Sequence, residues 1–165
     1  MKNLREADLY EPVRKWFESA LAHRYPRCRV KAYDTSRARL SSFISQLGLQ
    51  ASFPECGVWD IKVDVTALIT GKQNRVAFVE CKTNLVTLRD VGQLLGYSLV
   101  AKPVAAILLS TEPPSDTLRS LLAVYGRYDI LVYDHENGSQ MLVARWDLSR
   151  GGIIHGETLP PGGKV

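Results

Sequence analysis

The stretch of this chain that decides its fold reads Val76-Ala77-Phe78-Val79-Glu80-Cys81-Lys82. It begins with an apolar run that is rich in β-favouring residues and too short for a helix, so it predicts a buried strand. Because side chains alternate across a strand, Glu80 and Lys82 should share one face, with Val79 and Cys81 on the other. A carboxylate on such a strand is costly unless a cation, a metal ion or several hydrogen bonds compensate it.

A second apolar strand precedes this one and carries another carboxylate. Asp64 stands within the run Lys62-Val63-Asp64-Val65-Thr66-Ala67-Leu68-Ile69. The polar segment Gly71-Lys72-Gln73-Asn74 predicts a hairpin that joins a strand over 58–70 to one over 75–83. Two carboxylates and a lysine on neighbouring strands indicate a divalent metal site directed at phosphate.

Length and composition indicate one globular domain. The 165 residues predict a single domain over 1–148, followed by an irregular Gly- and Pro-rich tail over 149–165. An apolar content of 45% and a charged content of 23% exclude the disordered and fibrous classes. The longest apolar runs, about seven to nine residues, are too short to span a bilayer, so we expect no membrane association.

The N-terminal segment and the cysteines predict the cellular location of the protein. Its charged beginning lacks the apolar region of a signal peptide. Cys28, Cys56 and Cys81 are widely spaced and odd in number, which argues against a disulfide framework and a structural zinc site. We therefore expect a reducing, cytoplasmic location.

The remaining pattern predicts helices on either side of the sheet strands. An amphipathic helix is expected over about 6–24, with Pro12 separating a short leading segment from the main helix. A short strand over 30–33 and a weaker helix over 37–47 should follow. A helix from Thr87 or Asp90 to Val100, with Leu99 on its apolar side, then leads into a buried strand over 104–110.

The C-terminal third predicts a helix and a hairpin. Ser115 should cap a helix whose inward side includes Tyr125. Strands over 130–134 and 141–147 should pair through a turn that contains Asn137-Gly138. The fold class is therefore α/β, with a mixed central sheet flanked by helices.

Cations gather in one part of the sequence, and the formal net charge is +4. Six of them fall within sixteen residues, and one more precedes Asp64: Arg24, Arg27, Arg29, Lys31, Arg37, Arg39 and Lys62. Such a segment fits a phosphate backbone and an ordinary solvated face about equally well. Lys62 could contact DNA or neutralise Asp60.

The arrangement of Asp64, a hairpin and Glu80-Cys81-Lys82 resembles the PD-(D/E)XK nuclease superfamily. Val63 stands where that superfamily usually has proline, a departure that affects no ligand. Gln93 and Tyr97, four residues apart and hence on one helix face, resemble the Q-x-x-x-Y motif of the RecB-type branch. The resemblance spans roughly residues 6–110. It implies a restriction-endonuclease-like core of order α-β-β-β-α-β, to which a C-terminal helix and hairpin are added.

The resemblance also implies roles for these residues. Asp64, Glu80 and the backbone carbonyl of Cys81 would hold Mg²⁺ or Mn²⁺, and Lys82 would orient or activate a water and offset developing charge. Gln93 and Tyr97 would position the substrate or support the site. Many members of the superfamily add an acidic residue from the first helix, for which Glu11 is preferred and Glu6 is the alternative. Asp60 is the rival of Asp64, which is favoured because it leads directly into the hairpin.

The function implied is Mg²⁺-dependent hydrolysis of phosphodiester bonds in a nucleic acid, with DNA favoured. The resemblance allows a homodimer, because many members of the superfamily dimerise. One alternative is a catalytically inactive module of the same fold that binds nucleic acid or a protein partner. Another is a structural protein whose acidic and basic residues pair internally.

Overall fold

A mixed six-stranded sheet forms the centre of the computed structural model, which describes residues 4–165. Its strands, in spatial order, are β1 (Arg29–Asp34), β2 (Val65–Thr70), β3 (Arg75–Lys82), β4 (Ala106–Ser110), β7 (Leu142–Asp147) and β8 (Gly152–Ile153). β1, β2 and β3 are antiparallel neighbours, whereas β3, β4 and β7 run parallel and β8 returns antiparallel. The predicted α/β class with a mixed sheet is confirmed.

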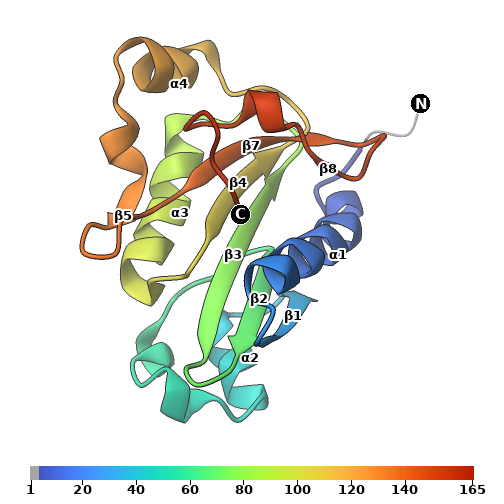
Figure 1. The fold of residues 1–165 in the computed structure, drawn as a ribbon, viewed down its shortest axis with the longest axis vertical. Helices are drawn as coiled ribbons and strands as arrows, with labels where there is room; N and C mark the ends of the chain where they lie inside the picture. The colour runs from blue at the N-terminus through green and yellow to red at the C-terminus, as the bar shows by residue number, and fades with distance from the viewer. Residues whose placement is uncertain (1–3) are drawn as a thin grey trace.

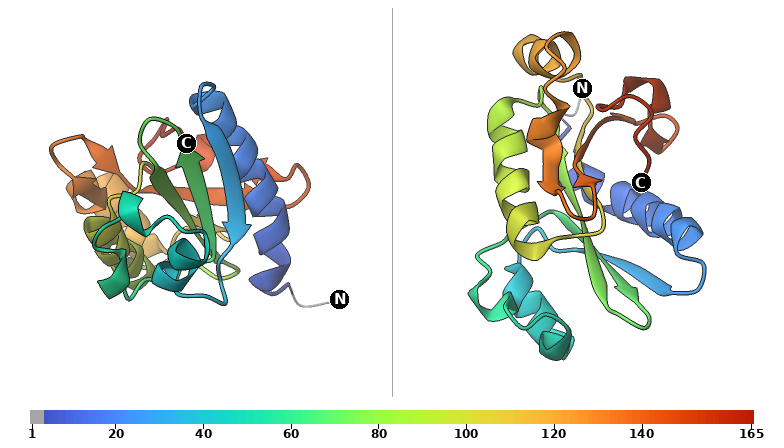
Figure 2. Two further views of the ribbon diagram at one scale, coloured as in Figure 1. Left: turned by 90° about the horizontal axis from the view of Figure 1, so that it is seen from below. Right: turned by 60° about the vertical axis from the view of Figure 1, so that its left-hand side comes forward.

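Helices cover both faces of this sheet (Figures 1 and 2). The longer ones are α1 (Ala7–Arg24), α2 (Leu40–Gln46) and α3 (Leu88–Ala101). A four-residue helix, α4 (Asp116–Arg119), and five short turns complete the set: η1 (Gln50–Ser52), η2 (Cys56–Val58), η3 (Ser120–Val124), η4 (Tyr128–Leu131) and η5 (His155–Glu157). None of the helices within residues 4–165 is long and apolar enough to cross a membrane.

The sheet separates two hydrophobic cores. Phe17 and Leu21 of α1 pack with Val79 and Cys81 on one face. Ile44 of α2 and Leu94 of α3 lie in the other core, together with Phe78 and Leu108. Figure 2 shows α1 and α3 on opposite sides of the sheet. β3 is therefore buried on both faces, and the prediction that this apolar run forms a buried strand is confirmed.

The hairpin between β2 and β3 places the predicted site at one end of the sheet. Val65 pairs with Val79 across this hairpin, and Lys82 pairs with Ser110 of β4. Asp64 therefore lies immediately before β2, while Glu80 and Lys82 end β3. Cys81 faces the α1 core, which confirms the predicted alternation.

The strand expected over 58–70 begins only at Val65. Val58 closes η2 and is 86% exposed, and residues 59–64 form no ladder. Ile61 and Val63 are nevertheless buried, which explains why the sequence alternates like a strand. The register of β1 with β2 ends at Asp34 and Val65, so the residues before Val65 have no strand partner on that side.

Two helices differ from their predicted form. α1 is continuous, with Pro12 inside it, so the expected division at Pro12 is wrong. α3 does begin after Thr87, whose side chain and that of Asp90 form a capping box. Its buried positions include Leu94 and Ser98, whereas Leu99 is 52% exposed, because five residues from Leu94 turn a helix through about 140°.

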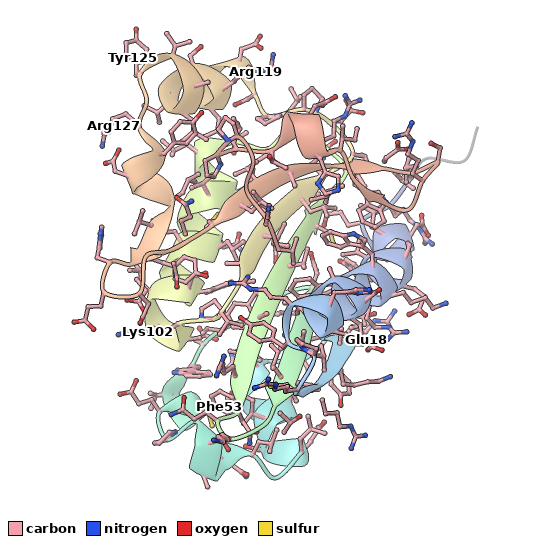
Figure 3. All side chains as sticks on the ribbon, viewed as in Figure 1. Glu18, Phe53, Lys102, Arg119, Tyr125 and Arg127 are labelled. Atoms are coloured by element: carbon pink, nitrogen blue, oxygen red, sulfur yellow. The ribbon has the colours of Figure 1, made fainter. Side chains whose placement is uncertain are left out.

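Beyond α4 the chain forms a π-turn over Ser120–Val124, in which the amide of Tyr125 bonds to the carbonyl of Ser120. The wider turn changes the helical phase, and Tyr125 is 75% exposed instead of facing inward. Figure 3 shows Tyr125 at the periphery of the molecule, near Arg119 and Arg127.

The expected pairing of strands over 130–134 and 141–147 is wrong, because the C-terminal hairpin closes earlier in the chain. β5 (Val132–Asp134) pairs with β6 (Ser139–Gln140), while β7 lies beside β4 in the main sheet. The segment 149–165 is mainly irregular, but β8 and a bridge between Val143 and Leu159 attach it to β7.

Candidate functional site

Two buried carboxylates meet where β2 begins and β3 ends. Asp64 is 9% exposed and Glu80 is 8% exposed. Asp64 Oδ2 accepts a hydrogen bond of 2.8 Å from the backbone N–H of Cys81. This bond ties the residue before β2 to the middle of the Glu80–Lys82 motif, so the structure brings the two predicted carboxylates together.

Lys82 satisfies only one of the two oxygens of Glu80. Lys82 Nζ donates to Glu80 Oε1 at 3.1 Å, and both side chains are largely buried. Glu80 Oε2 is buried without a hydrogen-bond partner among the residues described. A buried carboxylate oxygen without a donor is costly, which makes this atom the least satisfied point of the site.

The electrostatics of the site follow from this crowding. Burial, reinforced by the charge of Asp64, raises the pKa of Glu80 to about 7, against the opposing effect of Lys82. Burial likewise raises the pKa of Asp64, although the Cys81 amide favours the ionised form. For Lys82, burial lowers the pKa, but the nearby carboxylates outweigh it and the net pKa is raised. Lys82 is therefore an ammonium at neutral pH, with excess negative charge around it.

The first helix contributes Glu6 and Tyr10 to this charge network. Burial raises the pKa of Glu6, and the charges of Lys82, Asp64 and Asp90 all act on it. Tyr10 lies one turn further along, and burial together with the nearby carboxylate of Asp64 raises the pKa of its hydroxyl. The spacing of four residues puts Glu6 and Tyr10 on the same helix face.

Glu11, the preferred sequence candidate, is engaged elsewhere. Its carboxylate forms ion pairs with Arg14 at 2.8 Å and with Lys15 at 3.2 Å, and these cations lower the pKa of Glu11 to about 2. Five residues from Glu6 correspond to about 140° around the helix, so Glu11 projects in another direction. The structure thus places Glu6, the alternative, beside the carboxylates.

Thr35 holds the segment before Asp64 in place, a role that the sequence analysis missed. Its amide donates to the carbonyl of Asp64 at 2.8 Å, and its hydroxyl donates to the carbonyl of Val63 at 2.8 Å. The same hydroxyl lies 2.9 Å from that of Thr66. A polar residue directly after a strand that pairs with β2 was the only available signal in the sequence.

The rival and supporting residues lie outside this network. Asp60 is exposed and pairs with Arg39 at 3.6 Å, so it does not share the environment of Asp64. Gln93 donates to the hydroxyl of Tyr97 at 3.5 Å, which confirms that the two share a helix face. Within residues 4–165, no hydrogen bond or ion pair joins Gln93 or Tyr97 to the carboxylates.

The basic residues divide into separate groups. Arg24, Arg27 and Arg29 belong to the segment where α1 ends and β1 begins, and Arg29 pairs with Thr70 at the end of β2 away from Asp64. Lys31 pairs with Glu18 at 3.7 Å. The other three, Arg37, Arg39 and Lys62, are exposed in the segments that precede α2 and Asp64.

Across residues 4–165, no three His, Cys, Asp or Glu side chains are grouped as a metal site. The donor set implied by the sequence contains only two side chains, Asp64 and Glu80, and the carbonyl of Cys81. A residue in a strand turns its N–H and C=O to the same side, so this carbonyl faces the side of Asp64. The free oxygen of Glu80 and the hard oxygen donors around it fit a divalent cation such as Mg²⁺.

Comparison with known proteins identifies no relative. No family model matches the chain, and neither a curated protein nor a solved structure matches it. The interpretation of the site therefore depends on its own chemistry.

Proposed function

We propose that the protein is a metal-dependent nuclease with a restriction-endonuclease-like core, a member of the PD-(D/E)XK superfamily. The observation that carries the proposal is Glu80 Oε2, a buried carboxylate oxygen with no described hydrogen-bond partner, beside the second buried carboxylate of Asp64. A divalent cation would satisfy this oxygen and favour the ionised form of both carboxylates, whose pKa values burial raises.

The order of elements supports this assignment. α1, β1, β2, β3, α3 and β4 follow one another, with α2 and two short turns inserted between β1 and β2. This is the α-β-β-β-α-β order of the superfamily. The motif residues lie at the open end of the β2–β3 hairpin, away from its turn. Fold alone does not determine activity, so the proposal depends on the carboxylates.

A bound Mg²⁺ would act as a Lewis acid, lowering the pKa of a coordinated water and neutralising phosphate charge. Asp64, Glu80 and the Cys81 carbonyl would be the donors. The ammonium of Lys82 would attract the phosphate and stabilise the negative charge that develops on its oxygens. Because the carboxylates raise the pKa of Lys82, orienting water and offsetting charge suit it better than accepting a proton.

The reaction would be hydrolysis of a phosphodiester. A water oxygen forms a bond to phosphorus, the bond from phosphorus to one sugar oxygen breaks, and that oxygen gains a proton as the attacking water loses one. We propose that the substrate is DNA and that the protein acts in the cytoplasm. Gln93 and Tyr97, joined on the face of α3, would contact the substrate or support the site.

The test is cleavage of linear duplex, single-stranded, flapped and four-way DNA, and of RNA, each with Mg²⁺ and with Mn²⁺. We expect D64N, E80Q and K82A to lower the rate by roughly 100-fold or more, since the first two remove the charge that would hold the metal and the third removes the ammonium that would face the phosphate. D60N is the matched control and should stay within about twofold of wild type, because Asp60 is exposed and paired with Arg39. Equal losses in D60N and D64N would refute the site assignment.

An inactive module of this fold is the second candidate, and the Lys82–Glu80 ion pair is the observation that favours it. In that case the pair is purely structural, and no substrate is cut with either metal. Titration calorimetry distinguishes the two, because the nuclease requires Mg²⁺ or Mn²⁺ binding that E80Q abolishes. No heat of binding at millimolar metal would favour the inactive module.

A further inference from the structure

Arg37, Arg39 and Lys62, called here the basic arm, come together although 23 residues separate the last two in sequence. The segment that follows β1 runs beside the segment that precedes β2. The amide of Leu40 donates to the carbonyl of Ile61 at 2.8 Å, and Thr35 bonds to the carbonyls of Val63 and Asp64 at the other end. The two segments are therefore fixed to each other at both ends, although neither is a strand.

The two segments that carry the basic arm expose its cations to solvent, because the apolar residues of these segments are buried in the core. Leu40, Ile61 and Val63 are almost fully buried. Lys62, between two buried neighbours, is exposed, and so are Arg37 and Arg39. The buried neighbours hold the backbone that carries the three cations, so the fold determines where these cations lie relative to Asp64.

Few of these charges are neutralised locally. Within the described part of the chain, Arg37 and Lys62 form no ion pair, and Arg39 has one partner, Asp60, at 3.6 Å. Both members of that pair are exposed, so it contributes little stability and can be exchanged for another anion. The nearby Asp34 is engaged by the amide and hydroxyl of Ser36.

The arm adjoins the carboxylates directly. Lys62 is two residues before Asp64, so their Cα atoms are at most about 7 Å apart. Phosphates of one strand follow one another at about 3.4 Å of rise along the duplex axis, so the phosphates next to one held at Asp64 lie at a comparable distance. A strand whose phosphate lies at Asp64 and Glu80 would therefore place its next phosphates against the arm.

We propose that the basic arm binds the DNA backbone beside the bond to be cut, and that the cations where α1 ends and β1 begins do not. This assignment rests on the proposed nuclease function. It divides the basic segment of the sequence into a substrate-binding part and an ordinary surface part. Arg29 lies at the far end of β1, about 17 Å from Asp34 at 3.3 Å per residue, so a phosphate at the carboxylates is beyond its reach.

The test compares two triple variants that lose the same charge, R37A/R39A/K62A and R24A/R27A/R29A. Binding of a fluorescein-labelled 20-base-pair duplex is measured by anisotropy in EDTA, from 50 to 200 mM salt, so that no metal or cleavage is needed. All six side chains are exposed, and thermal unfolding checks that both variants fold.

The arm variant should reduce the slope of log K against log salt by about 2 to 3, or roughly 0.9 per lost phosphate contact. The variant with changes at Arg24, Arg27 and Arg29 should keep the wild-type slope. Equal slopes in the two variants, or a wild type that does not bind the duplex at 50 mM salt, would overturn the assignment.

The experiments distinguish a failure of the DNA-binding assignment of the basic arm from a failure of the nuclease proposal. Metal-dependent cleavage with an unchanged slope in the arm variant would refute the arm alone. A reduced slope without cleavage by the wild type would keep the arm and refute the nuclease. Polyglutamate serves as the acidic-protein probe, and a greater loss of its binding than of DNA binding in the arm variant would also overturn the proposal.

Discussion

Asp64 Oδ2 accepts the backbone N–H of Cys81 at 2.8 Å and so replaces the next rung of the β2–β3 ladder. Val65 and Val79 form the last regular pair, after which the chain before β2 leaves the sheet. A buried N–H without a partner is costly, so the carboxylate stabilises the end of β3 as well as providing charge. Structure and proposed metal binding therefore depend on the same side chain.

The two roles of Asp64 can be separated by substitution. D64A leaves the Cys81 amide buried and unpaired, and should lower the free energy of unfolding by about 1–3 kcal/mol. D64N keeps an acceptor oxygen and should cost less than D64A, yet both should lose metal-dependent cleavage. Urea unfolding and cleavage rates measure the two effects. Equal destabilisation by the two variants would show that the hydrogen bond contributes nothing.

Glu80 should make the metal-free protein less stable as the pH rises. Its pKa in the folded state is about 7, above the ordinary 4.5 that applies when the chain is unfolded. The folded state therefore binds more protons between these values, so stability is lost as the pH rises from about 4.5 to 7 and is not regained above that. E80Q should lack this contribution and be more stable than wild type at pH 8, by about 1–3 kcal/mol.

Chemical unfolding in EDTA from pH 5 to 8 measures this effect. E55Q is the control, because Glu55 is an exposed carboxylate and its loss should leave the wild-type pH dependence intact. A wild-type stability that increases steadily from pH 5 to 8 would contradict the raised pKa of Glu80.

Glu6 and Glu11 should differ sharply when each is changed to Gln. Glu6 is half-buried and feels the charges of Lys82 and Asp64, whereas Glu11 pairs with Arg14 and Lys15. We expect E6Q to lower metal-dependent cleavage by roughly tenfold, about 1.4 kcal/mol of transition-state stabilisation, and to weaken Mn²⁺ binding in calorimetry. E11Q should change neither. A larger effect of E11Q would restore the preference drawn from the sequence.

Local patterns were sufficient for most of the sheet. The apolar run before Glu80 predicted a buried strand, and the polar turn after Thr70 predicted the hairpin. The strand expected from Val58 failed because alternating burial has two causes. Ile61 and Val63 alternate because both are buried in the core that also contains Leu40, without the ladder that defines a strand.

The site could be predicted only where its residues are close in sequence or belong to one motif. Asp64, Glu80 and Lys82 follow from a single hairpin. The choice of Glu6 over Glu11 depends on how α1 is rotated about its axis, which packing against the sheet decides. Tyr10 and Thr35 reach Asp64 from elements more than 25 residues away, and nothing in a single sequence marks such a contact.

Thr35 provides the test of whether the segment before β2 must be held rigidly. T35V keeps the shape but removes the hydroxyl that bonds to the carbonyl of Val63 and lies beside Thr66. Because these groups are buried, we expect a loss of about 1–3 kcal/mol in the free energy of unfolding. Asp64 should then be less well placed, so cleavage should fall even at temperatures where the variant is fully folded.

T35S is the matched control for this variant, since it retains the hydroxyl and loses only a methyl group. It should recover most of the cleavage rate and the Mn²⁺ affinity that T35V loses. If T35V were destabilised but cleaved DNA and bound Mn²⁺ like wild type, Thr35 would support the fold without positioning Asp64. If T35V and T35S lost activity equally, the hydrogen bond to Val63 alone could not explain how Asp64 is held, because T35S keeps the hydroxyl.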